Sequence, residues 1–248
     1  MSSAQYPSLR GKRVVVTGGA SGIGEVLVEA FVRQGASVAF LDILQAEGAA
    51  LEGRHGTGCT GPKFHVCDLK DLAAVQTVFE RIGAVDILVN NAANDDRHNL
   101  EDITPEYWDD RMAVNLRHLL FCAKAVVPGM RAAGGGAIIN FGSISWHLGL
   151  SGLALYETAK AGIEGMTRAL ARELGPDNIR VTAIVPGNVK TPRQSLWYTA
   201  EDEREIVAQQ CLDARLGPEH VASLALFLVS DDGAMCTGHE YWIDAGWR

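Results

Sequence analysis

The sequence lacks several features that would place it in a specialised class of protein. No apolar run reaches the roughly 18 residues that a membrane-spanning helix needs. The opening stretch, MSSAQYPSLRGKR, lacks the apolar core of a secretory signal. Internal repeats, low-complexity tracts and linkers rich in Pro and Ser are also missing. We therefore expect one domain over 1–248, no membrane partner and a cytoplasmic location.

Paired cysteines and excess basic charge are missing as well. The five cysteines, one of which is Cys59, are odd in number and form no CxxC pair. This argues against a disulfide framework and against a zinc site, so we expect reduced thiols and no metal. Lys and Arg total 22 against 30 Asp and Glu, which gives a net charge of −8. A protein of that charge is not expected to bind nucleic acid through the phosphate backbone.

What is present is an alternation of short β-branched runs with longer helical patterns. Several of the runs have no polar alternation, which is typical of strands covered on both faces. The expected strands are 14–16, 38–41, 64–66, 87–89, 137–141, 181–184 and 241–243. The expected helices are 23–34, 72–81, 105–131, 156–174 and 218–229. This alternation predicts an α/β fold of the doubly wound type, a mostly seven-stranded parallel sheet flanked by helices.

The segment from 189 to about 211 interrupts this pattern. It is polar and aromatic, includes Trp197 and Tyr198, and has weak strand signals. Such a segment between two regular elements is typical of a functional loop, so we expect a mobile substrate lid there. The alternative is an ordinary pair of surface helices.

A glycine-rich loop follows the first expected strand. Gly18, Gly22 and Gly24 have the spacing G-x3-G-x-G and precede a helical pattern. Glycines in that context permit a tight turn, close approach of a pyrophosphate and close packing of helix on strand. The N-terminus of the helix also offers free N–H groups to a phosphate. The loop, with Ser21 and Ile23, therefore predicts a dinucleotide site; the alternative is a turn that needs only positive φ.

Acidic residues follow the next two strands. Asp42 ends the second strand, where a carboxylate can accept hydrogen bonds from the ribose hydroxyls and repel a 2′-phosphate. No Lys or Arg lies in the glycine loop or directly after Asp42, so NAD is favoured over NADP. Asp68 could hold the adenine amino group or cap the next helix. The neighbouring residues expected to line the same site are Ile43, Leu69, Asn91 and Ala92.

Tyr156 and Lys160 lie at positions i and i+4 of an expected helix, so their side chains share one face. An ammonium beside a phenol lowers the phenol pKa from its usual value of about 10. Tyr156 could then act as a base near neutral pH. Ser143 ends the fifth expected strand, where its hydroxyl could bind a reacting oxygen, and Ser145 is a competing candidate.

In order and spacing, these motifs resemble the classical short-chain dehydrogenase/reductase family over nearly the whole chain. The resemblance implies that Tyr156 is the general acid/base and that Ser143 orients the substrate oxygen. It implies that Lys160 binds the nicotinamide ribose and depresses the Tyr156 pKa. Asn115 would hold a water that links Lys160 to solvent. The residues that would cover the nicotinamide are Pro186, Gly187, Val189 and Thr191. Ala93 is a departure, because the family usually has glycine there.

Longer segments resemble bacterial NAD-dependent aldose 1-dehydrogenases within that family, namely 90–100, 140–150, 185–194 and 236–248. The resemblance implies oxidation of the anomeric hydroxyl of a free cyclic sugar to its lactone. D-xylose is the expected sugar, with L-arabinose, L-fucose and L-rhamnose as alternatives. A non-sugar secondary alcohol or ketone as substrate, and a nucleotide-binding regulator with a degenerate site, are further hypotheses. The candidate substrate-binding residues are Asn94, Ser143, Ser145, His147, Tyr156 and Asn188.

Two groups of residues keep two interpretations. Asp95, Asp96 and Arg97 either belong to the sugar site or form a solvated charge cluster, and Trp146 belongs either to that site or to a core or subunit interface. Trp247 and Arg248 follow an apolar strand, and in tetramers of the family this end packs near a neighbouring site. The resemblance therefore implies a homotetramer.

Overall fold

The computed structural model describes residues 4–55, 61–196 and 198–247. Cys59, Trp197 and Arg248, named above, lie outside the described residues. Seven strands form one sheet in the order β3-β2-β1-β4-β5-β6-β7, and all neighbouring pairs are parallel. The strands are β1 (Arg13–Thr17), β2 (Ser37–Asp42), β3 (Lys63–Val66), β4 (Ile87–Asn90), β5 (Gly136–Phe141), β6 (Ile179–Pro186) and β7 (Glu240–Ile243). The predicted doubly wound parallel sheet is confirmed.

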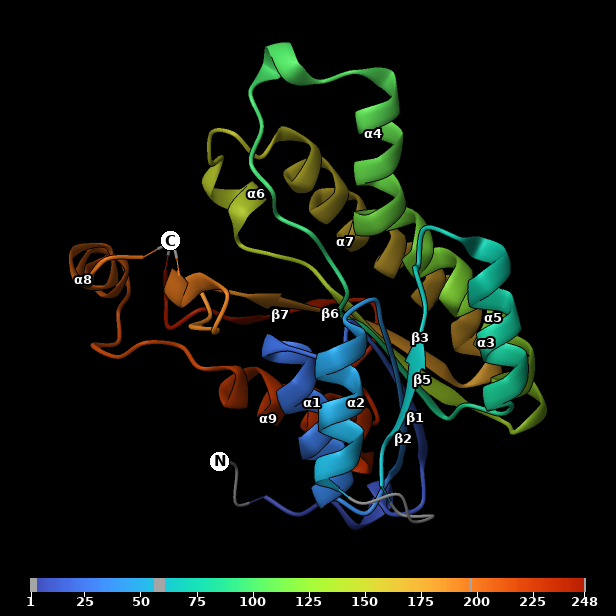
Figure 1. Cartoon of the computed structure of the whole chain (residues 1–248). Helices are drawn as coiled ribbons and strands as arrows, with labels where there is room; N and C mark the ends of the chain where they lie inside the picture. The colour runs from blue at the N-terminus through green and yellow to red at the C-terminus, as the bar shows by residue number, and fades with distance from the viewer. Residues whose placement is uncertain (1–3, 56–60, 197, 248) are drawn as a thin grey trace.

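Helices cover both faces of the sheet (Figure 1). Successive strand side chains point to opposite faces, so Val14 and Val16 join one buried core and Val15 joins the other. The first core contains side chains of α1 (Gly22–Arg33), α2 (Gln45–Arg54) and α9 (Pro218–Val229). The second contains side chains of α3 (Leu72–Ile82), α5 (His118–Ala132) and α7 (Ala154–Leu174). Burial on both faces explains why the strands lack polar alternation.

The helix expected over 105–131 contains a change of helix type. It begins as α4 (Pro105–Met112), where the Thr104 hydroxyl accepts a hydrogen bond from the Tyr107 amide. A π-helical turn (Ala113–Arg117) follows and leads directly into α5. Val114 of this turn lines the cavity described below, and π-helical turns occur frequently at functional sites.

Among the described α-helices of eight residues or more, two were not predicted from the sequence. The pattern of α2 is weak, because only Gly48 and Leu51 are buried and its N-cap residue makes no side-chain hydrogen bond. The other is α8 (Ala200–Ala208), so the expectation of a loop was wrong at 200–208. A capping box marks its start, since Thr199 and Asp202 exchange side-chain and backbone hydrogen bonds. The mobility expected for the lid stays a prediction.

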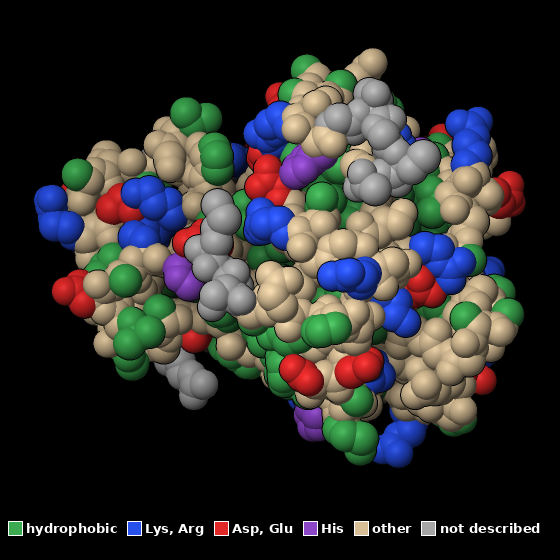
Figure 2. Space-filling model, turned by 90° about the horizontal axis from the view of Figure 1, so that it is seen from below, with side chains coloured by type: hydrophobic (Ala, Val, Ile, Leu, Met, Phe, Trp, Pro, Cys, Tyr) green, Lys and Arg blue, Asp and Glu red, His purple; other side chains and the backbone are tan. Residues whose placement is uncertain are grey.

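The face seen in Figure 2 mixes charges of both signs. Basic and acidic side chains are interspersed over it and separated by polar and apolar groups. Within the described ranges, no helix combines the length and the apolar character that crossing a bilayer requires.

Candidate active site

A cavity of about 550 Å³ lies beyond the carboxyl ends of the central strands. It opens at the switch point between β1 and β4, where the chain changes its direction across the sheet and where ligands bind in folds of this type. Every residue that the sequence predicted for the cofactor lines it. They are Gly18, Ser21, Gly22, Ile23, Gly24, Asp42, Ile43, Asp68, Leu69, Asn91, Ala92, Tyr156, Lys160, Pro186, Gly187, Val189 and Thr191. Ser143, Ser145, Asn94 and Asn188 line it too.

The glycine loop forms a cradle that side chains would fill. Gly18 has a φ of +64° and Gly22 a φ of +57°, in the left-handed region that favours glycine. A Cβ on Gly18 would lie 2.7 Å from the Cα of Ala92, and one on Gly24 would overlap the Gly18 carbonyl oxygen. A Cβ on Gly22 would lie 3.5 Å from the Thr191 side chain across the cavity. The loop therefore fits a group that must approach the backbone closely, as a pyrophosphate does.

Asn91 braces this loop from the neighbouring strand. Its side-chain Nδ2 donates to the carbonyl oxygens of Thr17 at 3.1 Å and Gly18 at 2.9 Å. Its backbone N donates to the Thr17 hydroxyl at 3.0 Å. These contacts bind the ends of β1 and β4 together and hold the glycine loop rigid.

Asp42 presents its carboxylate at the far end of the cavity. One oxygen accepts from the Ala20 amide at 2.9 Å and the other from the Leu44 amide at 3.1 Å. Each oxygen keeps a free lone pair, so hydroxyl donors can still bind. No ion pair to Asp42 occurs among the residues that the structure describes. These groups fit the ribose of a dinucleotide.

Asp68 does not cap the helix that follows it, which removes one of its two interpretations. The cap of α3 is Asp71, whose side chain accepts from the amides of Ala73 and Ala74. Asp68 instead accepts from the Lys70 amide at 2.9 Å and lines the cavity. Its contact with the adenine stays a prediction.

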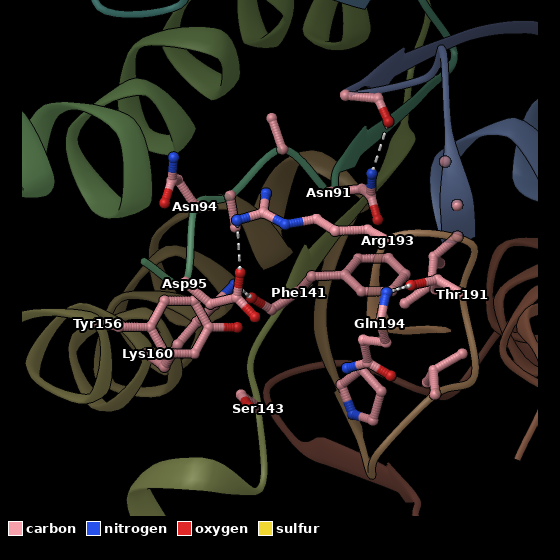
Figure 3. A pocket seen from close by; sticks show the side chains of 18 of the residues that line it. Asn91, Asn94, Asp95, Phe141, Ser143, Tyr156, Lys160, Thr191, Arg193 and Gln194 are labelled. Atoms are coloured by element: carbon pink, nitrogen blue, oxygen red, sulfur yellow. Dashed lines mark hydrogen bonds and ion pairs between the residues drawn. The ribbon is translucent and has the colours of Figure 1, made fainter. Parts of the chain in front are cut away.

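Tyr156, Lys160 and Ser143 meet at the other end of the cavity (Figure 3). Ser143 and Tyr156 both line this end, and the Ser143 hydroxyl acts to lower the pKa of the Tyr156 phenol. Lys160 is buried, and its Nζ lies 5.3 Å from the centroid of the Tyr156 ring. The same Nζ donates to the Phe141 carbonyl oxygen at 2.7 Å. A hydroxyl, a phenol and an ammonium placed in this way can hold a substrate oxygen and exchange a proton with it.

Burial governs the acid–base properties of this group. Desolvation lowers the pKa of Lys160 to about 8, with the charge of Asp95 acting in the opposite direction. Desolvation and then Asp95 hold the pKa of Tyr156 above its ordinary range, while Ser143 and Arg193 act to lower it. In this structure burial opposes the depression of the Tyr156 pKa that was expected from Lys160, and the effect of Lys160 on that pKa stays a prediction. The phenol is half-buried in the cavity wall, and the desolvation of its charged form is the largest effect on its pKa.

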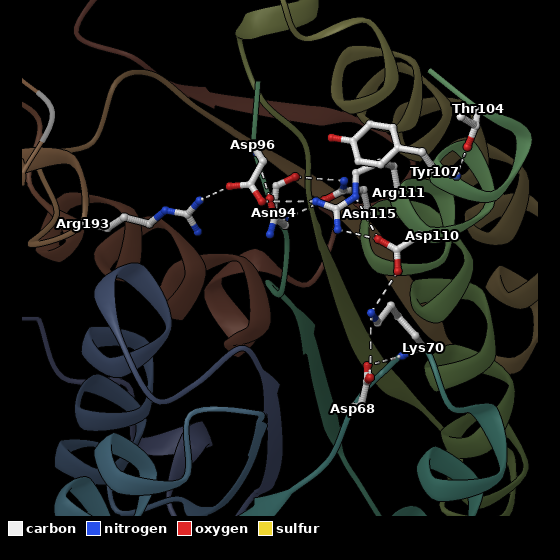
Figure 4. Close-up of polar contacts among 10 residues, drawn as sticks. All are labelled: Asp68, Lys70, Asn94, Asp96, Thr104, Tyr107, Asp110, Arg111, Asn115 and Arg193. Atoms are coloured by element: carbon white, nitrogen blue, oxygen red, sulfur yellow. Dashed lines mark hydrogen bonds and ion pairs between the residues drawn. The ribbon is translucent and has the colours of Figure 1, made fainter. Parts of the chain in front are cut away.

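A ladder of charges crosses the mouth of the cavity (Figure 4). Arg193 lies 3.2 Å from a carboxylate oxygen of Asp95 and 2.9 Å from one of Asp96. Arg111 forms ion pairs with Asp96 and with Asp110, which extends this row of charges. The two interpretations of this acidic segment divide between its members. Asp95 lines the cavity, whereas Asp96 lies outside the cavity lining with its side chain 52% exposed.

Asn115 is buried in the π-helical turn and lies behind the cavity wall. Its Oδ1 accepts from the Asn94 amide at 2.8 Å and its Nδ2 donates to the Asn94 carbonyl oxygen at 3.0 Å. Both polar groups of the side chain thus hold the loop after β4 in place. A water linking Lys160 to solvent stays a prediction.

His147 is the substrate-binding candidate that the structure does not bring into the cavity. The short helix α6 (Ser145–Leu148) directs it away. Its ring lies between Trp146 and Trp242, at centroid distances of 3.6 and 4.2 Å. Its Nε2 is 3.2 Å from an oxygen of Glu164, which also accepts from Trp146 Nε1. The expectation for His147 is corrected to packing within this cluster, and Trp146 belongs to the same cluster.

Ser145 remains a good candidate for contact with a ligand. It lines the cavity, and its backbone N donates to the Ser143 hydroxyl at 3.2 Å. Its own hydroxyl is buried and has no hydrogen-bond partner in the described part of the chain. A buried hydroxyl in a cavity wall fits a polar ligand, because burial without a partner is unfavourable.

Sequence reasoning missed three residues of this region. Arg193 and Gln194 line the cavity, and Arg215 contacts Asn188 from outside the cavity lining. None of them stands in a recognisable motif, because their partners lie far away in the sequence. Trp247 also lines the cavity of its own chain.

The chain is similar over its length to several known proteins. A family model described as enoyl-(acyl carrier protein) reductase matches residues 18–248. The chain is 66% identical to the D-xylose 1-dehydrogenase of Caulobacter vibrioides over 248 residues, which is 100% of both chains. It is 47% identical to the "Probable galactose dehydrogenase GalD" of Rhizobium meliloti, over 99% of this chain and 98% of that one. A solved structure described as a short chain dehydrogenase/reductase family protein matches with a TM-score of 0.86 and 30% identity, covering 96% of this chain and 98% of that one.

Proposed function

The chain belongs to the short-chain dehydrogenase/reductase family, and from that premise we propose that it oxidises the anomeric hydroxyl of a free aldose with NAD. The observation that carries the proposal is the cavity with a glycine cradle and Asp42 at one end and Tyr156, Lys160 and Ser143 at the other. D-xylose is the proposed sugar, because the relative at 66% identity over its full length is named for it.

The proposed cofactor site would use residues that line the cavity. The cradle of Gly18, Gly22 and Gly24 would hold the pyrophosphate, and Asp42 would accept from the adenosine ribose hydroxyls. Asp68 would hold the adenine. NAD is proposed over NADP because the Asp42 carboxylate would repel a 2′-phosphate. Among the described residues, no cation forms an ion pair with Asp42 that would offset this repulsion. When bound, the nicotinamide supplies the acceptor for a hydride.

The proposed chemistry removes two hydrogens from the sugar. Ser143 holds the anomeric oxygen beside the Tyr156 phenol. The phenolate of Tyr156 takes the proton of that hydroxyl, the C1–H bond gives up its electron pair as hydride, and C1 becomes the carbonyl carbon of the lactone. Lys160 places a positive charge near the phenolate while it stays protonated, below its pKa of about 8. Because burial raises the pKa of Tyr156, sugar oxidation should accelerate as the pH rises through neutrality.

The test is a panel of free aldoses and simple secondary alcohols, with NADH absorbance as the readout. We expect turnover with D-xylose and NAD, a lactone as the first product, and lower kcat/KM with NADP. Turnover of secondary alcohols with no turnover of any aldose would contradict the proposal. D-galactose belongs in the panel, because the relative at 47% identity is named a galactose dehydrogenase and favours a second aldose as the alternative substrate.

We also propose a homotetramer, with Trp247 near a subunit contact. Trp247 lines the cavity at the end of the described chain, so a neighbouring subunit that packed there would influence the site. Light scattering coupled to size exclusion measures the assembly directly, and a monomer at micromolar concentration would contradict this proposal.

A further inference from the structure

Asn188 lies at the substrate end of the cavity. It follows β6 by two residues and lines the cavity. The carbonyl oxygen of Pro186, at the end of β6, accepts from the Ile144 amide at 3.2 Å. This bond ties the segment after β6 to the segment that carries Ser143. Asn188 is therefore held at the same end of the cavity as the groups that would bind the reacting oxygen.

Arg215 determines which way the amide of Asn188 points. Its Nη2 donates to Asn188 Oδ1 at 3.0 Å, and its Nη1 donates to the Asn188 carbonyl oxygen at 3.2 Å. A guanidinium has only donors, so the atom facing it must be the amide oxygen. Glu203 holds the guanidinium in turn, accepting from its Nε at 2.8 Å. The Arg215 side chain is only 14% exposed, so this orientation is locked by a buried charge.

The locked amide then directs the hydroxyl of Tyr198. Asn188 Nδ2 lies 3.1 Å from the Tyr198 oxygen and donates to it. A phenol oxygen that accepts in this way still has its own proton to donate. No described residue accepts that proton, and Tyr198 lines the cavity. The Tyr198 O–H is thus a donor available to a ligand, and the chain of bonds that starts at a cation strengthens it.

We propose that Tyr198 is a substrate-binding residue that donates its O–H to a sugar oxygen away from C1. Arg215 is the positioning residue that, through Asn188, keeps this donor available. The assignment rests on the proposed aldose oxidation, because a sugar offers hydroxyl and ring oxygens as acceptors. It changes the role expected for Asn188, which orients a neighbour in addition to lining the site.

Two substitutions remove the same donor in different ways. Tyr198→Phe deletes the hydroxyl. Asn188→Asp keeps the acceptor for Arg215 but has no N–H, so the Tyr198 proton turns to the new carboxylate instead of the substrate. We expect each to raise the KM for D-xylose about tenfold, with kcat within about twofold and the KM for NAD unchanged. In the double variant the KM should equal that of either single variant, because the donor is lost only once.

The positioning role of Arg215 is tested by one substitution that removes its charge and one that keeps it. Arg215→Met should raise the sugar KM severalfold, since the Asn188 amide can then turn, and Arg215→Lys should restore most of the affinity. The matched control is Lys190→Gln. Lys190 pairs with the same Glu203 carboxylate at 3.3 Å but is not a cavity-lining residue, so its loss should leave both KM values unchanged.

The outcomes separate this assignment from the proposed function. An unchanged sugar KM in Tyr198→Phe, in an enzyme that oxidises D-xylose, overturns the assignment alone. The assignment is also overturned if the rise in sugar KM in the double variant equals the product of the rises in the Tyr198→Phe and Asn188→Asp single variants. Failure of the unchanged protein to oxidise any aldose overturns the proposed function and the assignment together.

Discussion

The Asp95 carboxylate pairs with the Arg193 guanidinium at 3.2 Å and joins the segment after β4 to the segment after β6. Both groups influence Tyr156, in opposite directions. Asp95 raises the pKa of the phenol and Arg193 lowers it. The pair therefore combines a mechanical contact across the cavity with an electrostatic control on the proposed base.

The two partners should accordingly shift the pH profile in opposite directions. Asp95→Asn removes a negative charge near Tyr156 and lowers its pKa, so the rise of kcat/KM with pH should move to lower pH. Arg193→Met removes a positive charge, so the rise should move to higher pH. Steady-state oxidation of D-xylose between pH 6 and about pH 10 measures both.

The control for this pair is Asp96→Asn. Asp96 contacts the same guanidinium at 2.9 Å but lies outside the cavity lining, so the pH profile should stay in place. Shifts of Asp95→Asn and Arg193→Met in the same direction would show that only the mechanical contact matters.

Tyr156→Phe should abolish most of the turnover without altering the fold. The change deletes one hydroxyl, which is the group proposed to accept the substrate proton, and it leaves the aromatic ring in the cavity wall. We expect kcat to fall by about 10² to 10⁴-fold. NADH binding, followed by fluorescence titration, should be unchanged. Turnover within a few-fold of the unchanged protein would contradict the proposed role.

Asp42→Ala should change the choice of cofactor. The Asp42 carboxylate lines the cavity beyond β2, where it would accept from the ribose and repel a 2′-phosphate. Its removal should raise the ratio of kcat/KM for NADP to that for NAD by about tenfold or more. An unaltered ratio would show that discrimination between the two cofactors resides elsewhere in the cavity.

His118 should make the protein sensitive to mild acid. Burial lowers its pKa to about 3 from 6.5, with Lys160 acting in the same direction. Between these values the unfolded chain binds a proton that the native chain excludes, so stability falls as the pH drops. The slope is at most about 1.4 kcal/mol per pH unit. Urea unfolding at fixed protein concentration, from pH 7 to pH 4, measures it.

The comparison for this prediction is His118→Gln, which carries no titratable group. The free energy of unfolding of this variant should fall less steeply between pH 7 and pH 4 than that of the unchanged protein, even where its stability at pH 7 is lower. If the free energy of unfolding falls equally steeply with pH in the two proteins, the acid sensitivity belongs to other groups.

Much of the site was predictable because its parts are local in the chain. The glycine loop follows a strand directly, and Tyr156 and Lys160 share a helix face at a spacing of four residues. His147 shows the limit of this reasoning. Although His147 is two residues from Ser145, one short helical turn carries it into a cluster with Trp242 and Glu164, out of the cavity. Adjacency in sequence therefore did not determine which way its side chain points.

The sequence by itself determined the parallel sheet, the cradle for a dinucleotide and the residues proposed for proton transfer. These features follow from hydrophobic runs, glycine spacing and helical periodicity, all of which act over a few residues. Only the tertiary structure decided the direction of the Tyr156 pKa and the orientation of the Tyr198 hydroxyl. The first depends on how far the folded chain buries the phenol, and the second on Arg215, which reaches Asn188 from another segment. Desolvation and hydrogen bonds between distant segments arise only once the chain has folded.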